Sequence, residues 1–271
     1  MSETHTMVSH PGSGSAPLLR TLPADQLADH DLIGDLLAGT LGGILVEGVF
    51  APALAAGVVE TLLHAPRDSG PVRAPPFPGI SYGAILVLSE PDLVEYHRRG
   101  EALLSVLTAA GLPLVEQLSA MLTKLSGGQV VLTPPEAPTP LTIRVFESGD
   151  GVGVHSERDD WPSMTGLRRR ILGETQLSCY TPLRQTAGGA LHLYHRPPPG
   201  FAPEIGGMPD DAAAEALARF GFTEIRPAVG DLLIFDGGRY NHRVLPAQQG
   251  QRWTAGAFLA QGRDGQRYAW S

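Results

Sequence analysis

Two histidines and a glutamate are the residues of this 271-residue chain whose types and spacing could bind a metal ion. His155 and Glu157 lie two positions apart in VHSERDDW, and residues two apart on a β-strand point to the same face. His242 lies far downstream, after the apolar stretch DLLIFDG. Two imidazoles and one carboxylate on one side of an ion favour Fe(II) in oxygenases that bind O2 and a co-substrate. Zinc more often takes a closed tetrahedral site or keeps one open position.

The sequence leaves alternatives for the carboxylate ligand. Asp159 has the same strand parity as His155, and Asp160 reaches that face if a β-bulge intervenes. A third interpretation places Glu157 in solvent, where it caps a loop. A His-Xaa-Glu tripeptide alone is weak evidence in a chain with nine histidines, so the prediction of a metal site needs a further element.

That element is a candidate anion clamp in the stretch RWTAGAFLA, where Arg252 and Thr254 share one strand face. A buried arginine is costly unless it meets an anion, and the planar guanidinium binds a carboxylate at two points. The pair therefore predicts a site for the distal carboxylate of 2-oxoglutarate, with a hydrogen bond from the Thr254 hydroxyl. The alternative is a surface arginine at a strand end.

The elements that must position these residues change in character along the chain. Residues 1–17 are rich in Gly, Ser and Pro and predict a mobile tail. Residues 18–127 predict a helical support, and residues 128–271 predict a β-rich core interrupted by an insertion at about 197–222 that contains a helix. Within the support, helices are expected over residues 22–39, 51–65, 92–111 and 112–128, and strands over 42–50 and 81–89.

The texture of the second half indicates the fold. Short apolar stretches such as LTIRVFES, TQLSCYTPL and DLLIFDG recur at near-regular spacing and are divided by Gly, Pro or Asn. This pattern is typical of double-sheet jelly rolls, which include the cupins. The predicted fold is mainly β with an α-rich N-terminal half, and residues 18–271 form a single domain.

Composition narrows the possible partners. The net charge of −8 and the absence of a long basic run disfavour nucleic acid and anionic membranes. No apolar run reaches the roughly 18 residues of a membrane span, and the N-terminus lacks the features of a signal peptide. Cys179 is the only cysteine, so no internal disulfide can form and a cytoplasmic location is expected.

Eight stretches of the chain together resemble one enzyme family. They run from about residue 42 to the C-terminus: GGILVEGVF, SYGAILVLSEPDLVEY, LTIRVFESGDGVGVHS, LSCYTPL with GGALHLY, VGDLLIFDGGRYNHRV, RWTAGAFLA and YAWS. The family is that of the non-haem iron, 2-oxoglutarate-dependent oxygenases that contains the freestanding halogenases of the welwitindolinone and hapalindole pathways and the N-succinyl amino-acid hydroxylases. The resemblance implies a double-stranded β-helix, with Fe(II), 2-oxoglutarate and O2.

By position, the resemblance makes His155 and His242 iron ligands and Arg252 the residue that holds 2-oxoglutarate. The position of Glu157 holds glycine in the family's halogenases, where chloride binds iron, and aspartate in its hydroxylases. A glutamate disfavours chloride by crowding and by repulsion, so hydroxylation is expected rather than halogenation. Glutamate is one methylene longer than aspartate, so its carboxylate must fold back or the strand must shift.

The resemblance also places candidate substrate contacts. Ser178 falls near iron's open position, and Tyr82 and Ile85 fall in the substrate pocket. Trp161 is a candidate wall for an apolar or ring-bearing substrate, although a buried core tryptophan fits as well.

The leading hypothesis is an iron- and 2-oxoglutarate-dependent hydroxylase of a free small molecule, either an amino-acid derivative or a natural product. Desaturation, epoxidation or halogenation are alternatives from the same chemistry. A cupin-like protein that binds metal or a small molecule without turnover is the alternative from another class. Arg252 and Thr254 argue against it, since a simple metal binder needs no dicarboxylate clamp.

Overall fold

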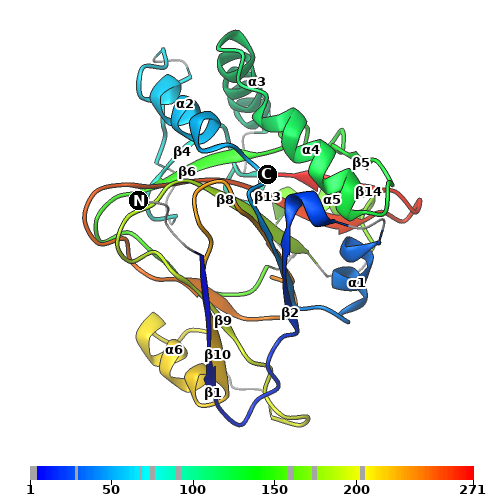
Figure 1. Ribbon diagram of the computed structural model, residues 1–271, viewed down its shortest axis with the longest axis vertical. Coiled ribbons are helices and arrows are strands. Elements are labelled where there is room, and N and C mark those ends of the chain that lie inside the picture. Colours follow the sequence, from blue (N-terminus) through cyan, green and yellow to red (C-terminus); the bar gives the residue numbers. More distant parts are fainter. Residues whose placement is uncertain are drawn as a thin grey trace.

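The computed structural model describes residues 5–27, 30–66, 69–73, 77–89, 93–157, 162–172, 176–201 and 205–271. Two β-sheets form its centre, and helices α2, α3 and α4 lie together beyond the larger sheet (Figure 1). The smaller sheet has the strand order β1-β10-β9-β12-β7. The larger sheet has the order β2-β3-β11-β8-β13-β14-β5, and β6 joins it beside β13 with β4 beside β6. This architecture confirms the predicted jelly roll flanked by helices.

The elements have the following bounds. The smaller sheet contains β1 (Thr6–Pro11), β7 (Val152–His155), β9 (Leu191–Tyr194), β10 (Gly221–Arg226) and β12 (His242–Val244). The larger contains β2 (Leu19–Pro23), β3 (Gly43–Glu47), β4 (Ile80–Tyr82), β5 (Val131–Leu132), β6 (Thr142–Phe146), β8 (Leu177–Arg184), β11 (Leu232–Phe235), β13 (Arg252–Gln261) and β14 (Arg267–Trp270). The helices are α1 (Leu32–Ala38), α2 (Pro52–Leu63), α3 (Leu93–Ala109), α4 (Leu114–Leu125), α5 (Thr165–Arg168) and α6 (Asp210–Ala218).

Strand periodicity divides the larger sheet between two environments. In β11, Leu232 and Ile234 belong to the core shared with the helices, whereas Leu233 and Phe235 pack toward the smaller sheet. Successive side chains of a strand point to opposite faces. Strands β6, β8 and β13 follow the same rule, so one face of each strand packs under the helices and the other lines the space between the sheets.

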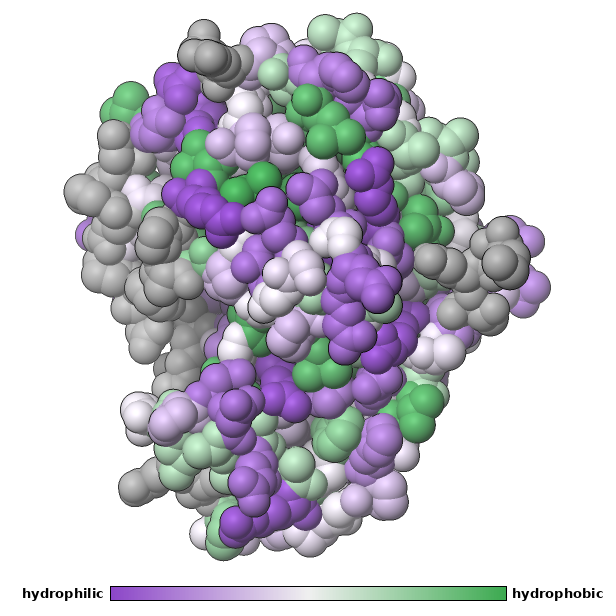
Figure 2. All heavy atoms as spheres, turned by 90° about the vertical axis from the view of Figure 1, so that its left-hand side faces the viewer, coloured by the Kyte–Doolittle hydropathy of each residue, from purple (hydrophilic) through white to green (hydrophobic). Residues whose placement is uncertain are grey.

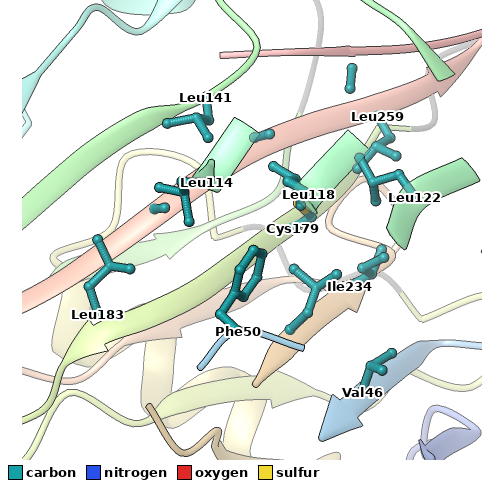
Figure 3. Close-up of a cluster of buried hydrophobic side chains, with 14 of the residues drawn as sticks. Val46, Phe50, Leu114, Leu118, Leu122, Leu141, Cys179, Leu183, Ile234 and Leu259 are labelled. Atoms are coloured by element: carbon teal, nitrogen blue, oxygen red, sulfur yellow. The ribbon is translucent and has the colours of Figure 1, made fainter. Parts of the chain in front are cut away.

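The core under the helices is built from apolar side chains at helical spacing. Leu114, Leu118 and Leu122 recur every fourth residue along α4 and lie over the sheet, near Cys179 and Ile234 (Figure 3). Full burial of one such side chain stabilises the fold by roughly 1.5–3 kcal/mol. Burial also raises the pKa of the Cys179 thiol to about 12. Cys179 is therefore part of this core.

Most of the predicted helices are present, and two predicted segments are only partly right. Helices α2, α3, α4 and α6 occupy the expected places. The α-helix expected over 22–39 is restricted to α1 among the described residues. Its first two residues, Leu22 and Pro23, end β2, which runs parallel to β3, and Ala24–Gln26 form a 3-10 turn. The strand expected over 81–89 ends at Tyr82 and gives way to a 3-10 turn, Leu86–Leu88. In the first place pairing within the sheet overrode the local spacing of leucines. In the second, the pairing of β4 with β6 ends at Tyr82, so the apolar residues that follow have no described partner strand.

The prediction that residues 1–17 form a mobile tail is wrong for Thr6–Pro11. These residues form β1, which pairs antiparallel with β10 at the edge of the smaller sheet. His10 stacks on Phe222 of β10, with ring centroids 4.4 Å apart. Because backbone hydrogen bonds hold an edge strand, a polar Gly/Ser-rich composition does not prevent one from forming.

Hydrophobic and hydrophilic residues alternate in small patches on the face drawn in Figure 2. Within the described part of the chain, no single helix is long and apolar enough to cross a membrane. Helices α3 and α4 reach that length and composition only as a pair, bent by 102° at the break between them.

Asp31 ties the start of α1 to the last strand, and its replacement tests that link. Its Oδ1 accepts a hydrogen bond from the Gly34 amide at 2.8 Å, and its carboxylate pairs with Arg267 of β14. Hydrogen bonding to Arg267 lowers the pKa of Asp31 below its usual 3.8. The ion pair therefore stabilises the fold fully when the pH is above the ordinary pKa of Asp31. This contribution is lost as the pH falls through the lowered pKa of the folded protein.

Asp31→Asn is expected to keep the helix cap and lose the ion pair, so its stability falls less than that of wild type on acidification. Asp31→Ala loses the cap as well, at a further cost of about 1 kcal/mol. Thermal unfolding of the three proteins from neutral pH downward checks both statements. Parallel pH curves for wild type and Asp31→Asn would contradict a role for the ion pair.

Candidate metal centre

Three side chains with metal-binding groups converge between the two sheets. His155 of β7, His242 of β12 and Glu157 offer ligand atoms that all lie within 4.8 Å of one another. Glu157 Oε1 lies 3.7 Å from Nε2 of His155 and 3.6 Å from Nε2 of His242. These separations are longer than a hydrogen bond, and ligand atoms held about 2 Å from one ion lie about 3 to 4 Å apart. The arrangement therefore suits a single metal ion.

Strand pairing brings the two histidines together. Strands β7 and β12 are antiparallel neighbours, and their register places His155 directly opposite His242. Side chains directly opposite on adjacent strands have Cβ atoms about 5 Å apart. The two imidazole rings accordingly lie with centroids 4.2 Å apart.

Backbone carbonyls set the orientation of both rings. His155 Nδ1 lies 2.8 Å from the carbonyl oxygen of Gly153, and His242 Nδ1 lies 3.0 Å from that of Tyr240. A carbonyl oxygen can only accept, so each Nδ1 carries the proton and donates it. Each Nε2 then keeps its lone pair and faces Glu157, which is how metal-binding histidines are usually oriented.

The charges of the cluster depend on one another. Burial disfavours the Glu157 carboxylate, but the two histidines hold its pKa well below the usual range. Burial also disfavours a charged His155, yet the Glu157 carboxylate raises the pKa of that imidazole. Burial and the charge of His155 lower the pKa of His242. Glu157 is thus an ionised carboxylate in a buried site, which is the state that binds a cation.

Two hydrogen bonds place the longer glutamate side chain. The Glu157 amide donates to the carbonyl oxygen of Gly237 at 2.8 Å, and the Ser178 hydroxyl donates to Glu157 Oε1 at 3.1 Å. These contacts direct the carboxylate toward the histidines rather than toward solvent. The alternative carboxylates, Asp159 and Asp160, lie outside the described residues.

The loop before His242 is fastened to helix α1. Asp236 is fully buried and accepts hydrogen bonds from the amide and the guanidinium of Arg239, at 3.0 and 2.5 Å. The same guanidinium donates to the carbonyl oxygens of Leu36 and Leu37 at the end of α1. These contacts position residues 236–241, which lead into His242.

Gly237 leaves the space that Glu157 occupies. A Cβ atom at this position would lie 2.5 Å from Ser178 Oγ and 2.7 Å from Glu157 Cγ, closer than such atoms approach. The backbone of Gly237 is not among the left-handed glycines, so alanine is excluded here by space alone.

Gly237→Ala is expected to displace the carboxylate and to weaken Fe(II) binding by about 10- to 100-fold, the usual cost of disturbing the surroundings of a metal ligand. Adding Glu157→Asp, which is one methylene shorter, is expected to restore part of the loss. Anaerobic metal titration of the single and double variants measures this. If Glu157→Asp weakens binding equally in both backgrounds, the two residues do not share this space.

The three side chains lie in a cavity of about 440 Å³ between the sheets. The inward faces of β6, β8 and β13 form one wall, which contributes Arg144, Ser178, Tyr180, Arg252 and Thr254. Apolar residues close the rest, among them Phe77, Ile85, Leu88, Leu191, Phe235 and Phe258. A cavity of this size with few polar groups is typical of small-molecule sites.

Arg252 is buried in this wall, and no carboxylate among the described residues forms an ion pair with it. Its side chain is 3% exposed, and none of the described residues accepts a hydrogen bond from its Nε atom. The guanidinium carbon lies 5.3 Å from the ring of Tyr180 and 5.7 Å from that of Phe146. Gly189 leaves the space that the Arg252 side chain occupies, because a Cβ atom at Gly189 would lie 2.6 Å from Arg252 Cδ. Burial lowers the pKa of Arg252, but an arginine stays charged, so the site requires an anion.

The other predicted contacts fall in different places. Thr254 and Ser178 line the cavity, as does Ile85. Tyr82 does not line it, because its ring stacks on Trp253 at 5.5 Å in the core under the helices. Trp161 lies outside the described residues.

Sequence reasoning missed three polar residues of the cavity, Arg144, Ser156 and Tyr180. Arg144 lies at the centre of β6, whose sequence is TIRVF. The other residues of this strand are apolar, apart from the buried Thr142. A charged residue at that position was the available signal, since strand parity points it away from Ile143 and Val145 into the cavity.

The chain matches one family model and shares its fold with solved structures. The family model described as carrier-protein-independent halogenase WelO5 matches residues 18–271. Two crystal structures of a novel N-substituted L-amino acid dioxygenase from Burkholderia ambifaria AMMD, one in complex with alpha-KG, match over 100% of both chains at 14% identity. Their TM-scores are 0.52 and 0.51, so this likeness shows the fold. No curated protein sequence matches the chain.

Proposed function

The chain belongs to the carrier-protein-independent halogenase WelO5 family, and from this premise we propose that it is an Fe(II)- and 2-oxoglutarate-dependent dioxygenase that hydroxylates an unactivated C–H bond of a free small molecule. One observation carries the proposal. A single cavity contains three side chains oriented as metal ligands and a buried guanidinium that pairs with no carboxylate of the described chain.

The residues fit an iron ion. His155, Glu157 and His242 supply two imidazoles and a carboxylate, the donor set that binds non-haem Fe(II) and leaves positions open for other ligands. The backbone carbonyls behind both rings keep the Nε2 lone pairs free. We assign these three residues as the iron ligands.

The residues also fit a dicarboxylate. Arg252 provides a buried, permanently charged fork, and Thr254 provides a hydroxyl two residues along the same strand face. We assign both to the distal carboxylate of 2-oxoglutarate, with the keto-acid end toward the histidines.

Bound iron and 2-oxoglutarate supply the oxidising chemistry, in which decarboxylation to succinate is coupled to oxidation of the substrate with O2. The chain's own residues bind, orient and shield. Ser178 holds the Glu157 carboxylate by its 3.1 Å hydrogen bond, and the apolar walls keep water from the reacting groups. Ile85, on that wall, and Ser178 are the proposed substrate contacts. The pose of the substrate between them decides which C–H bond reacts.

The domain organisation, the substrate class and the location of the protein complete the proposal. Residues 18–271 form one oxygenase domain, supported by the pairing of β2 with β3 in the larger sheet. The substrate is a free amino-acid derivative or natural product. The single cysteine, which is buried as a free thiol, supports a cytoplasmic location.

Anaerobic addition of Fe(II) and 2-oxoglutarate tests the proposal directly. The protein is expected to develop a visible charge-transfer band that neither component produces with it alone, and to release succinate when O2 is admitted. A cupin-like protein without turnover would bind metal but release no succinate. Absence of the band would discard the proposed function.

Glu157 favours hydroxylation over halogenation. Its side chain occupies the space that a chloride ligand of iron would need, and its negative charge would repel that chloride. Glu157→Gly removes a proposed ligand, so it is expected to lower Fe(II) affinity by at least about 100-fold without chloride and to recover part of it with chloride. Titrations with and without chloride, with nitrate as the control anion, measure this. Chloride that tightens Fe(II) binding to the wild-type protein would contradict the argument.

A further inference from the structure

The cavity contains a second guanidinium that the proposed function does not use. Arg144 of β6 points into the cavity beside Thr254, its register partner on β13. Its guanidinium carbon lies 5.5 Å from the ring of Phe258 and 5.7 Å from that of Phe77. None of the described residues accepts a hydrogen bond from its buried Nε atom.

Arg144 lies toward a different part of the cavity from Arg252. A Cβ atom built at Gly256 would stand 3.7 Å from the Arg144 guanidinium carbon, and Phe258 is two residues further along the same strand. Arg252 instead lies against Phe146 and Tyr180. One short dicarboxylate gripped at its far end by Arg252 therefore leaves Arg144 free for another carboxylate group.

Charge balance points the same way. With neutral histidines, two arginines and one glutamate leave the lining of the cavity with one net positive charge. Fe(II) and the 2-oxoglutarate dianion cancel each other, so that charge remains when both are bound. A buried guanidinium without an anion is costly. Burial lowers the pKa of Arg144, and the Glu157 carboxylate offsets part of that effect.

We propose that Arg144 binds a carboxylate group at the iron-facing side of the cavity, where Phe77, Ile85 and Phe258 accommodate the apolar part of its carrier. The carboxylate belongs either to the substrate or to the keto-acid end of 2-oxoglutarate. The inference rests on the proposed function and narrows it, since the first source makes the substrate an apolar carboxylic acid.

The test compares Arg144→Met with Arg184→Met, which removes the guanidinium of an exposed residue, 5.9 Å from the ring of Trp253. Both are titrated anaerobically as Fe(II) proteins with 2-oxoglutarate and with 2-oxobutyrate, which lacks the distal carboxylate. The Fe(II)·2-oxoglutarate proteins are then titrated with N-acetyl-L-leucine, phenylacetic acid and indole-3-acetic acid, each beside its primary amide. The charge-transfer band and calorimetry report binding.

If the keto acid is the source, Arg144→Met weakens both keto acids by about 30-fold or more. If the substrate is the source, keto-acid binding is unchanged, at least one panel acid binds wild type in preference to its amide, and Arg144→Met abolishes that preference. Arg184→Met behaves as wild type in either case. Arg144→Lys retains the charge without the fork and is expected to fall in between.

Stability separates this role from a structural one. Methionine keeps an apolar stem between the two phenylalanine rings and removes an unpartnered buried polar group. The metal-free Arg144→Met protein is therefore expected to melt no lower than wild type, and a lower melting temperature would indicate a structural residue.

The proposal is overturned if Arg144→Met leaves both keto acids unchanged and no panel acid depends on Arg144, including the case in which no panel acid binds. A wild-type protein without a charge-transfer band overturns the proposed function as well. A wild-type band with unaltered Arg144→Met behaviour overturns this inference alone.

Discussion

His242→Ala is expected to abolish the charge-transfer band of the Fe(II)·2-oxoglutarate protein and the release of succinate. His242 is 2% exposed and lies opposite His155 in the strand register, so no other described side chain can take its place. Loss of a contact that only supports a ligand costs up to about 100-fold in metal affinity. Loss of a direct ligand is therefore expected to lower Fe(II) affinity by at least that factor.

His64→Ala is the matched control for this variant, because His64 lies at the exposed end of α2 with 74% of its side chain accessible. It is expected to bind Fe(II) as wild type does. Survival of the band in His242→Ala, with the fold intact by circular dichroism, would exclude His242 as a ligand and with it the proposed centre.

Arg252→Met is expected to weaken 2-oxoglutarate binding by roughly 30- to 5,000-fold, the equivalent of about 2–5 kcal/mol for truncating one partner of a buried charge pair. Fe(II) affinity is expected to change little, because Arg252 is not part of the ligand cluster. Titration of the charge-transfer band with 2-oxoglutarate measures the effect.

A second keto acid makes this experiment specific. 2-Oxobutyrate lacks the distal carboxylate, so its weaker binding is expected to be the same in Arg252→Met and wild type. Equal losses for both keto acids would show that the variant damages the site in general and that Arg252 does not hold the distal carboxylate.

The local pattern was sufficient for much of the candidate site. Residues two apart on a strand share a face whatever sheet they join, so the common orientation of Arg252 and Thr254 could be predicted from the strand RWTAGAFLA. The same parity separates Ser178 from Cys179, and the structure places them in the cavity wall and in the core under the helices. The jelly roll was likewise predictable from the run of short strands.

Local pattern failed where the partner strand decides the outcome. β1 and β2 exist because β10 and β3 offer them backbone hydrogen bonds, and their own composition indicates tail and helix. Tyr82 could be placed on a strand, yet only the packing of Trp253 against it shows that it faces away from the cavity.

The sequence by itself determined the chemical groups, namely two imidazoles, one carboxylate and an arginine on strands of known parity. Only the tertiary structure decided that His155 stands opposite His242, that Gly237 makes room for the longer glutamate, and that Arg144 enters the same cavity. The reason is physical. The two faces of a strand are a local property of the backbone, whereas register, free volume and the sharing of one cavity depend on contacts between segments far apart in the chain.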